Sequence, residues 1–441
     1  MFGYKINLFS IDKSMDSLKG KRLLLLGSNL WKDDIKRFAD ENGIYLIFAG
    51  LYPGPLDTIA DEYYRIDTTD SSVMIPFIKE HSIDGIFMGG SELIISASCD
   101  YINELGYPCY CTKKQWDILQ NKNQFKECCK QYNVPTVPEF DLSSQLQNSD
   151  YPVIVKPVDA CSSKGISVCY DSIQYENAKQ SAFEVSPSKR IIVERYIDNG
   201  GITNDVYYVA IDGEYYLDAM GDRYVLNGGL ITAAVTFPSA YLDPWINNVD
   251  PMAREMMKGL GIKNGVVAFQ VLPEGDKLYV YECCFRLTGG MTYKMTDAVS
   301  GHNCFKLLFN HVLTGRMGDE NDVSKIAPYF NGKKGVSITI PLRLGTISSI
   351  QGFDEVKSLK QVVDYTHYYE VGDTIVSKSI NTLDQLFARI MIVSDTDSEL
   401  KQSISLVRRL VSIKDENGKE MIIWDTVDEL FGTEDVLKIK D

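Results

Sequence analysis

The feature that most constrains the fold is a change in strand pattern along the chain. Residues 21–112 alternate short apolar strands, the first at Arg22–Leu26, with helical segments. Strands that alternate with helices favour a parallel sheet with crossover helices. Beyond residue 150 the strands are rich in Tyr and Val and follow one another directly, which indicates an antiparallel sheet. We therefore predict a protein of mixed α/β and α+β class.

A chain of 441 residues is too long for one simple core and should form two to four subdomains. The pattern predicts an N-terminal arm over 1–20, a parallel α/β domain over 21–112, a strand-rich domain over 113–325 and a C-terminal subdomain over 326–441.

Three predicted elements of the strand-rich domain bear on function. Lys113–Tyr132 and Asp297–Thr314 are each expected to form one helix. Gly265–Leu272 and Lys277–Glu282 should form a hairpin, because the turn residues Pro273–Asp276 join them.

Charge and composition exclude several classes of partner. The 45 Lys and Arg residues face 60 Asp and Glu residues, so the formal net charge is -15. This charge repels phosphate backbones and anionic lipid, which argues against nucleic acid or a membrane surface as the main partner. The chain contains no apolar run near the roughly 20 residues that a membrane helix needs. Its first residues carry no signal-peptide pattern, so we expect a soluble, cytoplasmic protein.

The cysteine and histidine residues give no metal or disulfide pattern. Ten Cys are scattered without a CxxC pair, and only four His are present. This spacing argues against a zinc site and against a secreted disulfide framework. The first strand also lacks a following G-x-G-x-x-G turn, which excludes the dinucleotide fingerprint of NAD and FAD proteins.

The segment Tyr151–Cys169 is the most informative part of the sequence. Lys156 lies in a run of Val and Ile, where a buried ammonium group is costly unless an anion is near. The small residues of Ser162–Gly165 follow and return directly to a strand, a geometry that can fold backbone N–H groups over phosphates. An ordinary hairpin with a snorkelling lysine is the alternative interpretation.

Further polar residues end three later apolar strands. Ile191–Ile197 ends in groups that could present main-chain donors and acceptors to an adenine ring. Gln270 and Glu282 end neighbouring strands and could place an amide oxygen beside a carboxylate, as Mg²⁺ requires. Arg286 follows closely, so the segment indicates a phosphoryl-transfer site.

The order of these motifs resembles the ATP-grasp superfamily over roughly residues 20–430. The motifs are most similar to those of the carbamoyl-phosphate synthase large subunit, biotin carboxylase and L-amino-acid ligases. VKPVDACSSKGISV is similar to the phosphate loop, ERYI to the adenine hinge, and QVL…YECCFR to the metal-binding strands. The resemblance implies an ATP-grasp domain at 113–325, a preceding α/β domain and a carboxylase-like C-terminal subdomain.

The resemblance also implies a set of ATP contacts. It assigns the phosphates to Lys122 and Lys156, the loop covering them to Ser163, Lys164 and Gly165, the adenine to Glu194, Arg195 and Ile197, and the ribose to Asp205. An exposed helix lysine is the alternative for Lys122, and a solvated loop carboxylate is the alternative for Asp205.

By the same resemblance Gln270 and Glu282 would hold Mg²⁺, or Mn²⁺ in its place. Lys156 and Arg286 would be the catalytic residues, with Arg286 stabilising charge on the transferred phosphoryl group. Cys284 stands where the family has Asn as a further metal ligand, and a thiol is a poor partner for Mg²⁺. This departure keeps a catalytically silent ATP-binding module as an alternative.

We therefore expect an ADP-forming ligase that joins a small carboxylate to an amine through an acyl phosphate. Besides the silent regulatory module, the alternatives are a bicarbonate-using carboxylase and an enzyme like carbamoyl-phosphate synthase. Candidate substrate-pocket residues are Arg223, Arg286, Arg343 and Leu287–Tyr293. A homodimer is the default assembly.

Overall fold

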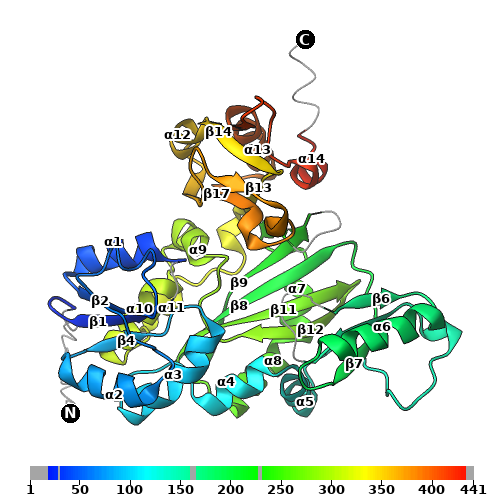
Figure 1. Ribbon diagram of the computed structural model, residues 1–441, viewed down its shortest axis with the longest axis horizontal. Coiled ribbons are helices and arrows are strands. Elements are labelled where there is room, and N and C mark those ends of the chain that lie inside the picture. Colours follow the sequence, from blue (N-terminus) through cyan, green and yellow to red (C-terminus); the bar gives the residue numbers. More distant parts are fainter. Residues whose placement is uncertain (1–17, 28–29, 159–164, 227–230, 434–441) are drawn as a thin grey trace, which may run out of the picture. The chain divides into compact units, whose positions relative to one another are not determined.

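The computed structural model describes residues 18–27, 30–158, 165–226 and 231–433. The chain divides into two compact units (Figure 1). The first comprises Met1–Thr112 with Phe309–Arg316, and the second comprises Lys113–Leu308 with Met317–Asp441.

The first unit contains a parallel sheet in the strand order β3-β2-β1-β4. Its elements are β1 (Arg22–Leu26), α1 (Lys32–Asn42), β2 (Tyr45–Ala49), β3 (Glu62–Tyr64), α2 (Ser71–Glu80), β4 (Gly85–Phe87) and α3 (Glu92–Glu104). The four leucines of β1 are fully buried, as expected for a strand covered on both faces. The predicted parallel α/β arrangement is confirmed.

A small antiparallel sheet in the second unit has the strand order β6-β5-β7. It consists of β5 (Val153–Pro157), β6 (Ser167–Cys169) and β7 (Ile191–Arg195), and α6 (Ser172–Val185) packs against it (Figure 1). Val153 and Val155 are buried against this helix. Because side chains alternate along a strand, Lys156 lies on the opposite face.

The large sheet is antiparallel and has the order β12-β11-β8-β9-β10-β13-β17-β15. Its strands are β8 (Ile202–Ile211), β9 (Glu214–Val225), β10 (Thr232–Phe237), β11 (Gly265–Glu274), β12 (Lys277–Cys284), β13 (Lys334–Pro341), β15 (Val362–His367) and β17 (Leu386–Ser394). The hairpin predicted for β11 and β12 is present. The sheet joins strands from both sides of residue 326, so the domain division placed there stays a prediction.

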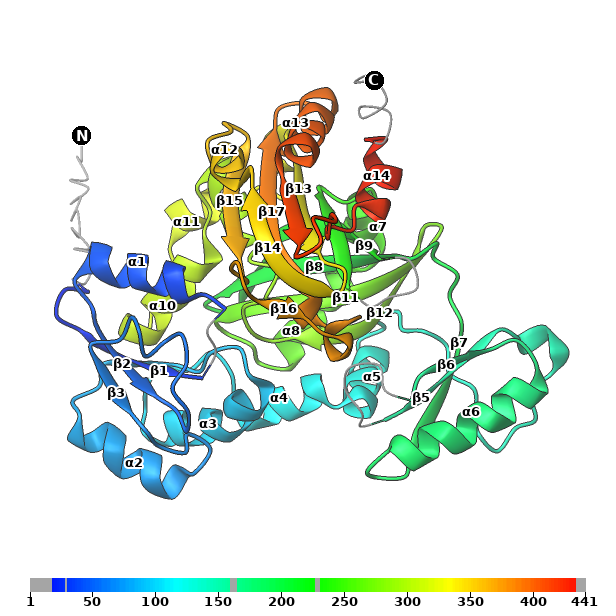
Figure 2. The same ribbon diagram turned by 45° about the horizontal axis from the view of Figure 1, so that its top comes forward.

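The third sheet of the second unit has the order β16-β14-β18. It is formed by β14 (Gly345–Gln351), β16 (Thr374–Ile375) and β18 (Ser412–Asp415). The other helices in this part of the chain are α7 (Leu242–Asn248), α8 (Asp250–Gly259), α11 (Glu320–Ser324), α12 (Phe353–Lys357), α13 (Asp397–Leu410) and α14 (Asp425–Phe431). Figure 2 shows α12 and α13 beside β15 and β17. Buried apolar side chains of this region form a core.

Two segments predicted as single helices are each divided in two. α4 (Lys113–Gln120) and α5 (Lys122–Gln131) are separated by Asn121, whose side chain caps α5 by accepting from the Gln124 N–H at 3.1 Å. α9 (Tyr293–Ser300) and α10 (Cys304–Thr314) are separated after Gly301, which has a φ of 77° and ends α9. The single-helix predictions were wrong because capping residues interrupt the apolar pattern.

None of the helices that the structure describes combines the length and the apolar character that a membrane span demands. The fold class predicted from the sequence is confirmed, with a parallel N-terminal sheet followed by antiparallel sheets.

Candidate functional site

Lys156 on β5 lies beside a buried carboxylate. Its Nζ contacts Oε2 of Glu194 on β7, and the two side chains are 15% and 3% exposed. Burial lowers the pKa of Lys156, and the negative charge of Glu194 acts in the opposite direction. The charges of Lys126 and Lys122 also lower this pKa, so both lysines lie near Lys156. The structure thus brings together Lys122, Lys156 and Glu194, which the sequence analysis assigned to ATP.

A further lysine joins this cluster from α5. The Nζ of Lys126 donates to the carbonyl oxygen of Val137 at 3.1 Å and to Oε1 of Glu139 at 2.5 Å, and it also contacts Oε1 of Glu194. The Glu194 carboxylate therefore bridges two ammonium groups, one on each oxygen.

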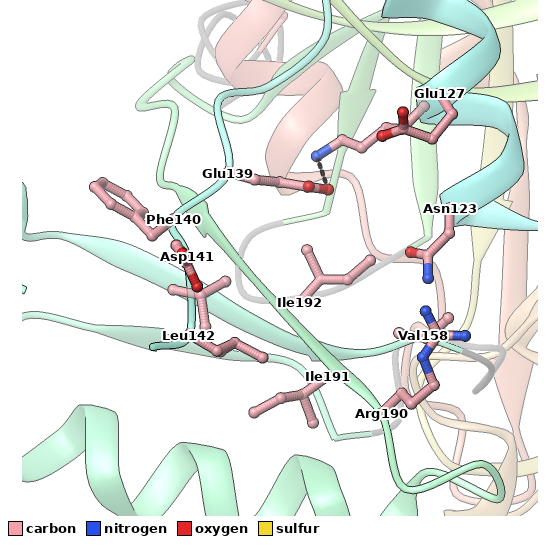
Figure 3. A pocket seen from close by; sticks show the side chains of 12 residues that line it. Asn123, Glu127, Glu139, Phe140, Asp141, Leu142, Val158, Arg190, Ile191 and Ile192 are labelled. Carbon is pink, nitrogen blue, oxygen red and sulfur yellow. Dashed lines mark hydrogen bonds and ion pairs between the residues drawn. The ribbon is translucent and has the colours of Figure 1, made fainter. Parts of the chain in front are cut away.

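A pocket of about 420 Å³ adjoins this cluster. Figure 3 shows Glu139 in the wall of the pocket, with its contact to Lys126 drawn as a dashed line. Apolar side chains line another part of the wall, among them Ile192 on β7 and Val158 directly after β5 (Figure 3). The cluster thus lies next to an open space with both charged and apolar walls.

The loop predicted to cover the phosphates is described only at its end. Gly165 has a φ of 74°, and an added Cβ would lie 3.2 Å from Cβ of Val185. The backbone conformation and the close contact both favour glycine here. Ser163 and Lys164 lie outside the described residues.

The predicted adenine hinge follows Glu194 along the chain. The Arg195 N–H donates to the Pro138 carbonyl at 3.0 Å, and the Arg195 guanidinium binds both oxygens of Glu274 at 2.8 Å. Ile197 is buried. Because lysines engage both carboxylate oxygens of Glu194, an adenine contact there depends on main-chain atoms. The hinge role of these residues stays a prediction.

Asp205, Gln270 and Glu282 form a row across three neighbouring strands. Gln270 on β11 is paired directly with Asp205 on β8 and with Glu282 on β12. Directly paired residues of an antiparallel sheet point to the same face. The register therefore places the two proposed metal ligands, Gln270 and Glu282, beside Asp205 on one face of the large sheet.

Arg223 on β9 orients the middle of this row. With the Gln270 amide turned so that its oxygen faces Arg223, the orientation that satisfies both ends of the amide, Arg223 Nη1 donates to that oxygen at 3.1 Å. The Gln270 nitrogen then donates to Oε2 of Glu282 at 3.1 Å. Arg223 Nη2 donates to the Tyr281 hydroxyl at 3.0 Å. Arg223 is thus a half-buried cation fixed at the site.

Asp205 lies 4.0 Å from this guanidinium. Burial raises the pKa of Asp205, and the positive charge of Arg223 opposes the rise. Asp205 lies on β8 within the sheet, so the alternative of a solvated loop carboxylate is excluded. Its assignment to the ribose stays a prediction.

The donor set fits a Mg²⁺ ion that takes its other ligands from water and phosphate. Mg²⁺ usually keeps several waters and binds one or two carboxylates together with substrate phosphates. Glu282 supplies one carboxylate, whereas the Gln270 oxygen already accepts from Arg223. Cys284 follows on the same face of β12 as a half-buried thiol. Across the described residues, no group of three or more His, Cys, Asp or Glu is arranged to hold a metal ion.

The remaining candidate arginines are anchored to main-chain oxygens. Arg286 Nη1 donates to the Leu287 carbonyl at 3.1 Å, and Arg343 Nη1 donates to the Ile422 carbonyl at 2.6 Å. The segment Leu287–Tyr293 is held through a contact from the Arg389 guanidinium to the Gly289 carbonyl. The catalytic role of Arg286 and the pocket roles of the others stay predictions.

The sequence interpretation missed Lys126 and Glu139. Lys126 follows Lys122 by one helical turn, so both lie on the same side of α5. This spacing was the available signal for Lys126. Glu139 carried no such signal, because its role depends on a contact made in three dimensions.

Comparison with known proteins bears on the same region. The family model for the C-terminus of D-ala D-ala ligase matches residues 127–215. An L-amino acid ligase from Bacillus licheniformis superposes with a TM-score of 0.73 at 18% identity, over 90% of this chain and 99% of the other. Residues 127–215 therefore match a ligase family model, and the chain shares the fold of the L-amino acid ligase. The fold implied by its motifs is confirmed, and both matches support the resemblance to ATP-grasp proteins.

A second solved structure has the same fold. The biotin carboxylase domain dimer of the 2-oxoglutarate carboxylase from Hydrogenobacter thermophilus, in complex with MgADP, ADP and bicarbonate, has a TM-score of 0.71. It is 17% identical and covers 91% of each chain. Identity this low shows a shared fold only.

A curated relative is the formate-dependent phosphoribosylglycinamide formyltransferase of Prochlorococcus marinus (strain MIT 9303). It is 27% identical over 187 residues, or 40% of this chain and 47% of the relative. The match thus spans less than half the length of the relative.

Proposed function

We propose that this protein is an ATP-grasp enzyme, an ATP- and Mg²⁺-dependent ligase that joins a small carboxylate to an amine. The observation that carries the proposal is the row of Asp205, Gln270 and Glu282, held in register beside the half-buried Arg223. A face with carboxylates and a fixed cation suits a phosphate chain and its Mg²⁺. The match to the D-ala D-ala ligase model and the fold shared with an L-amino acid ligase support the ligase assignment.

The proposed reaction has two steps. An oxygen of the substrate carboxylate bonds to the γ-phosphorus of ATP while the bond to the β–γ bridging oxygen breaks, so ADP leaves. The amine nitrogen then bonds to the acyl carbon, phosphate leaves, and the nitrogen loses a proton. These steps need positioning and charge neutralisation more than covalent chemistry from the protein.

The candidate site residues would bind the nucleotide and neutralise its charge in different ways. Lys122 and Lys156 would bind phosphate oxygens, and Arg286 would stabilise charge on the transferred group. Glu282 would hold Mg²⁺, which supplies further neutralisation of phosphate charge when it is bound.

The second candidate function is an ATP-binding module without catalysis. It is favoured by Cys284 at a metal-ligand position and by the engagement of the Gln270 oxygen with Arg223. Both features would weaken a metal site. ATP binding without turnover on a broad panel of carboxylates would support this module instead of the ligase.

The test measures nucleotide products across amino acids, dipeptides and amino sugars with Mg²⁺-ATP. With hydroxylamine in place of the amine, the ligase should form an acyl hydroxamate together with ADP. AMP in place of ADP would overturn the acyl-phosphate mechanism. ADP release that depends on bicarbonate alone would favour a carboxylase.

A binding measurement tests the nucleotide site separately. Lys156→Met should abolish the rise in melting temperature that ATP gives the unsubstituted protein. Lys258→Met is the control, because the Lys258 side chain is 71% exposed and its partner Glu255 is also on the surface. An unchanged ATP response of Lys156→Met would count against the assigned phosphate site.

A further inference from the structure

The two lysines that contact Glu194, Lys126 and Lys156, differ in their other contacts and in their exposure. Glu194 is 2% exposed, and each of its carboxylate oxygens contacts a different ammonium group. Lys126 makes three contacts, to Glu194, Glu139 and the Val137 carbonyl. An ammonium group has three N–H donors, so these contacts satisfy Lys126 completely.

Lys156 is the more exposed of the two lysines, at 15% against 8% for Lys126. Its ion-pair partner is Glu194. To bind a phosphate, the Lys156 ammonium must turn away from this carboxylate at least in part. A buried carboxylate that loses its only cation is strongly disfavoured, so Glu194 needs a second cation that stays.

We infer that Lys126 is a positioning residue that serves as the permanent counter-ion of Glu194 and so releases Lys156 to bind the phosphates of ATP. This inference rests on the proposed nucleotide site and names a residue that the ATP-grasp motifs did not assign. Glu139 supports it by accepting from the same Nζ at 2.5 Å, which holds Lys126 in place when Lys156 moves (Figure 3).

In Lys126→Met, Glu194 loses one of the two lysines that contact it. Glu194 would then have Lys156 as its one remaining cation and would compete with phosphate for it. ATP should bind at least tenfold more weakly, although Lys156 is still present. Lys130→Met is the matched control, because Lys130 lies one turn later on α5, pairs with Glu127 and is 54% exposed. It should bind ATP as the unsubstituted protein does.

A double variant separates this role from a merely structural one. In Lys126→Met/Glu194→Gln the competing carboxylate charge is gone, so ATP affinity should recover relative to Lys126→Met alone. If Lys126 only supported the fold, the second substitution would weaken binding further. The measurement is calorimetric titration of the full chain with ATP, with urea unfolding of each variant recorded in parallel.

Labelling of Lys156 gives a readout that needs no nucleotide. Lys126, Lys122 and Glu194 are the charged groups that act on Lys156. Removing the positive charge of Lys126 should raise the pKa of Lys156 and slow its reductive methylation near pH 9, as followed by mass spectrometry. Unchanged labelling would overturn the coupling of the two lysines.

The outcomes separate the inference from the proposed function. If the unsubstituted protein binds no ATP, the proposed function fails, whereas labelling still reports on the coupling. If it binds ATP and Lys126→Met binds equally well, the inference alone fails. A double variant that binds no better than Lys126→Met would also overturn the inference.

Discussion

Glu194→Gln is the perturbation whose consequence follows most directly from the structure. The substitution removes one negative charge from a carboxylate that is 3% exposed and contacts two lysines. Lys126 would keep Glu139, so the main loss falls on Lys156, which is 15% exposed. Breaking one partner of a buried ion pair typically costs about 3–5 kcal/mol, because an uncompensated charge remains. We expect the free energy of unfolding to fall by about this amount at pH 7.

The penalty should depend on pH in a defined direction. Burial lowers the pKa of Lys156, and the negative charge of Glu194 opposes this shift. Glu194→Gln removes that charge, so the pKa of Lys156 should fall further. Between this lowered pKa and the ordinary lysine value of about 10.4, the unfolded chain binds more protons than the native protein. The free energy of unfolding therefore rises with pH in that window. The difference in free energy of unfolding between Glu194→Gln and the unsubstituted protein should therefore become smaller as the pH is raised from 7 towards 10.

Urea unfolding followed by fluorescence at several pH values provides the assay. Glu274→Gln is the control. Glu274, like Glu194, forms an ion pair, but its partner is Arg195 and both of these side chains are about one-third exposed. Such exposed pairs contribute up to about 1 kcal/mol. If Glu194→Gln unfolded within about 1 kcal/mol of the unsubstituted protein and matched the control, the buried charge cluster would not have the energetic role argued for it.

Two further predictions concern other parts of the chain. Cys284→Asn adds an oxygen ligand two residues after Glu282, so it should lower the Mg²⁺ concentration needed for half-maximal ATP-induced stabilisation; lost stability with unchanged Mg²⁺ dependence would contradict this. Gly352→Ala should cost roughly 3 kcal/mol or more in urea unfolding, because φ is 84° and the new Cβ would lie 1.9 Å from the Leu410 carbonyl oxygen. Gly372→Ala, with φ of 99° and no atom within 4 Å, should cost only about 1–2 kcal/mol, and equal losses would refute the steric argument.

The sequence predicted the local elements well where apolar periodicity was strong. The leucine run of β1, the hairpin of β11 and β12 and the apolar strand carrying Lys156 are all present where expected. Helix ends were less predictable. Asn121 and Gly301 each divide a segment that periodicity alone presents as one helix, because a cap acts through local hydrogen bonds and backbone angles that an apolar pattern does not record.

By itself, then, the sequence determined which face of each strand a residue occupies, because side chains alternate along a strand whatever its partners are. Polar side chains within or at the ends of apolar strands placed Lys156, Gln270 and Glu282 among the candidate site residues. Only the tertiary structure decided which groups meet. Lys126 reaches Glu194 across 68 positions of sequence, and Gln270 pairs with Asp205 only through the register of β8 and β11. Register and long-range ion pairs depend on how distant segments pack, and no local pattern specifies that packing.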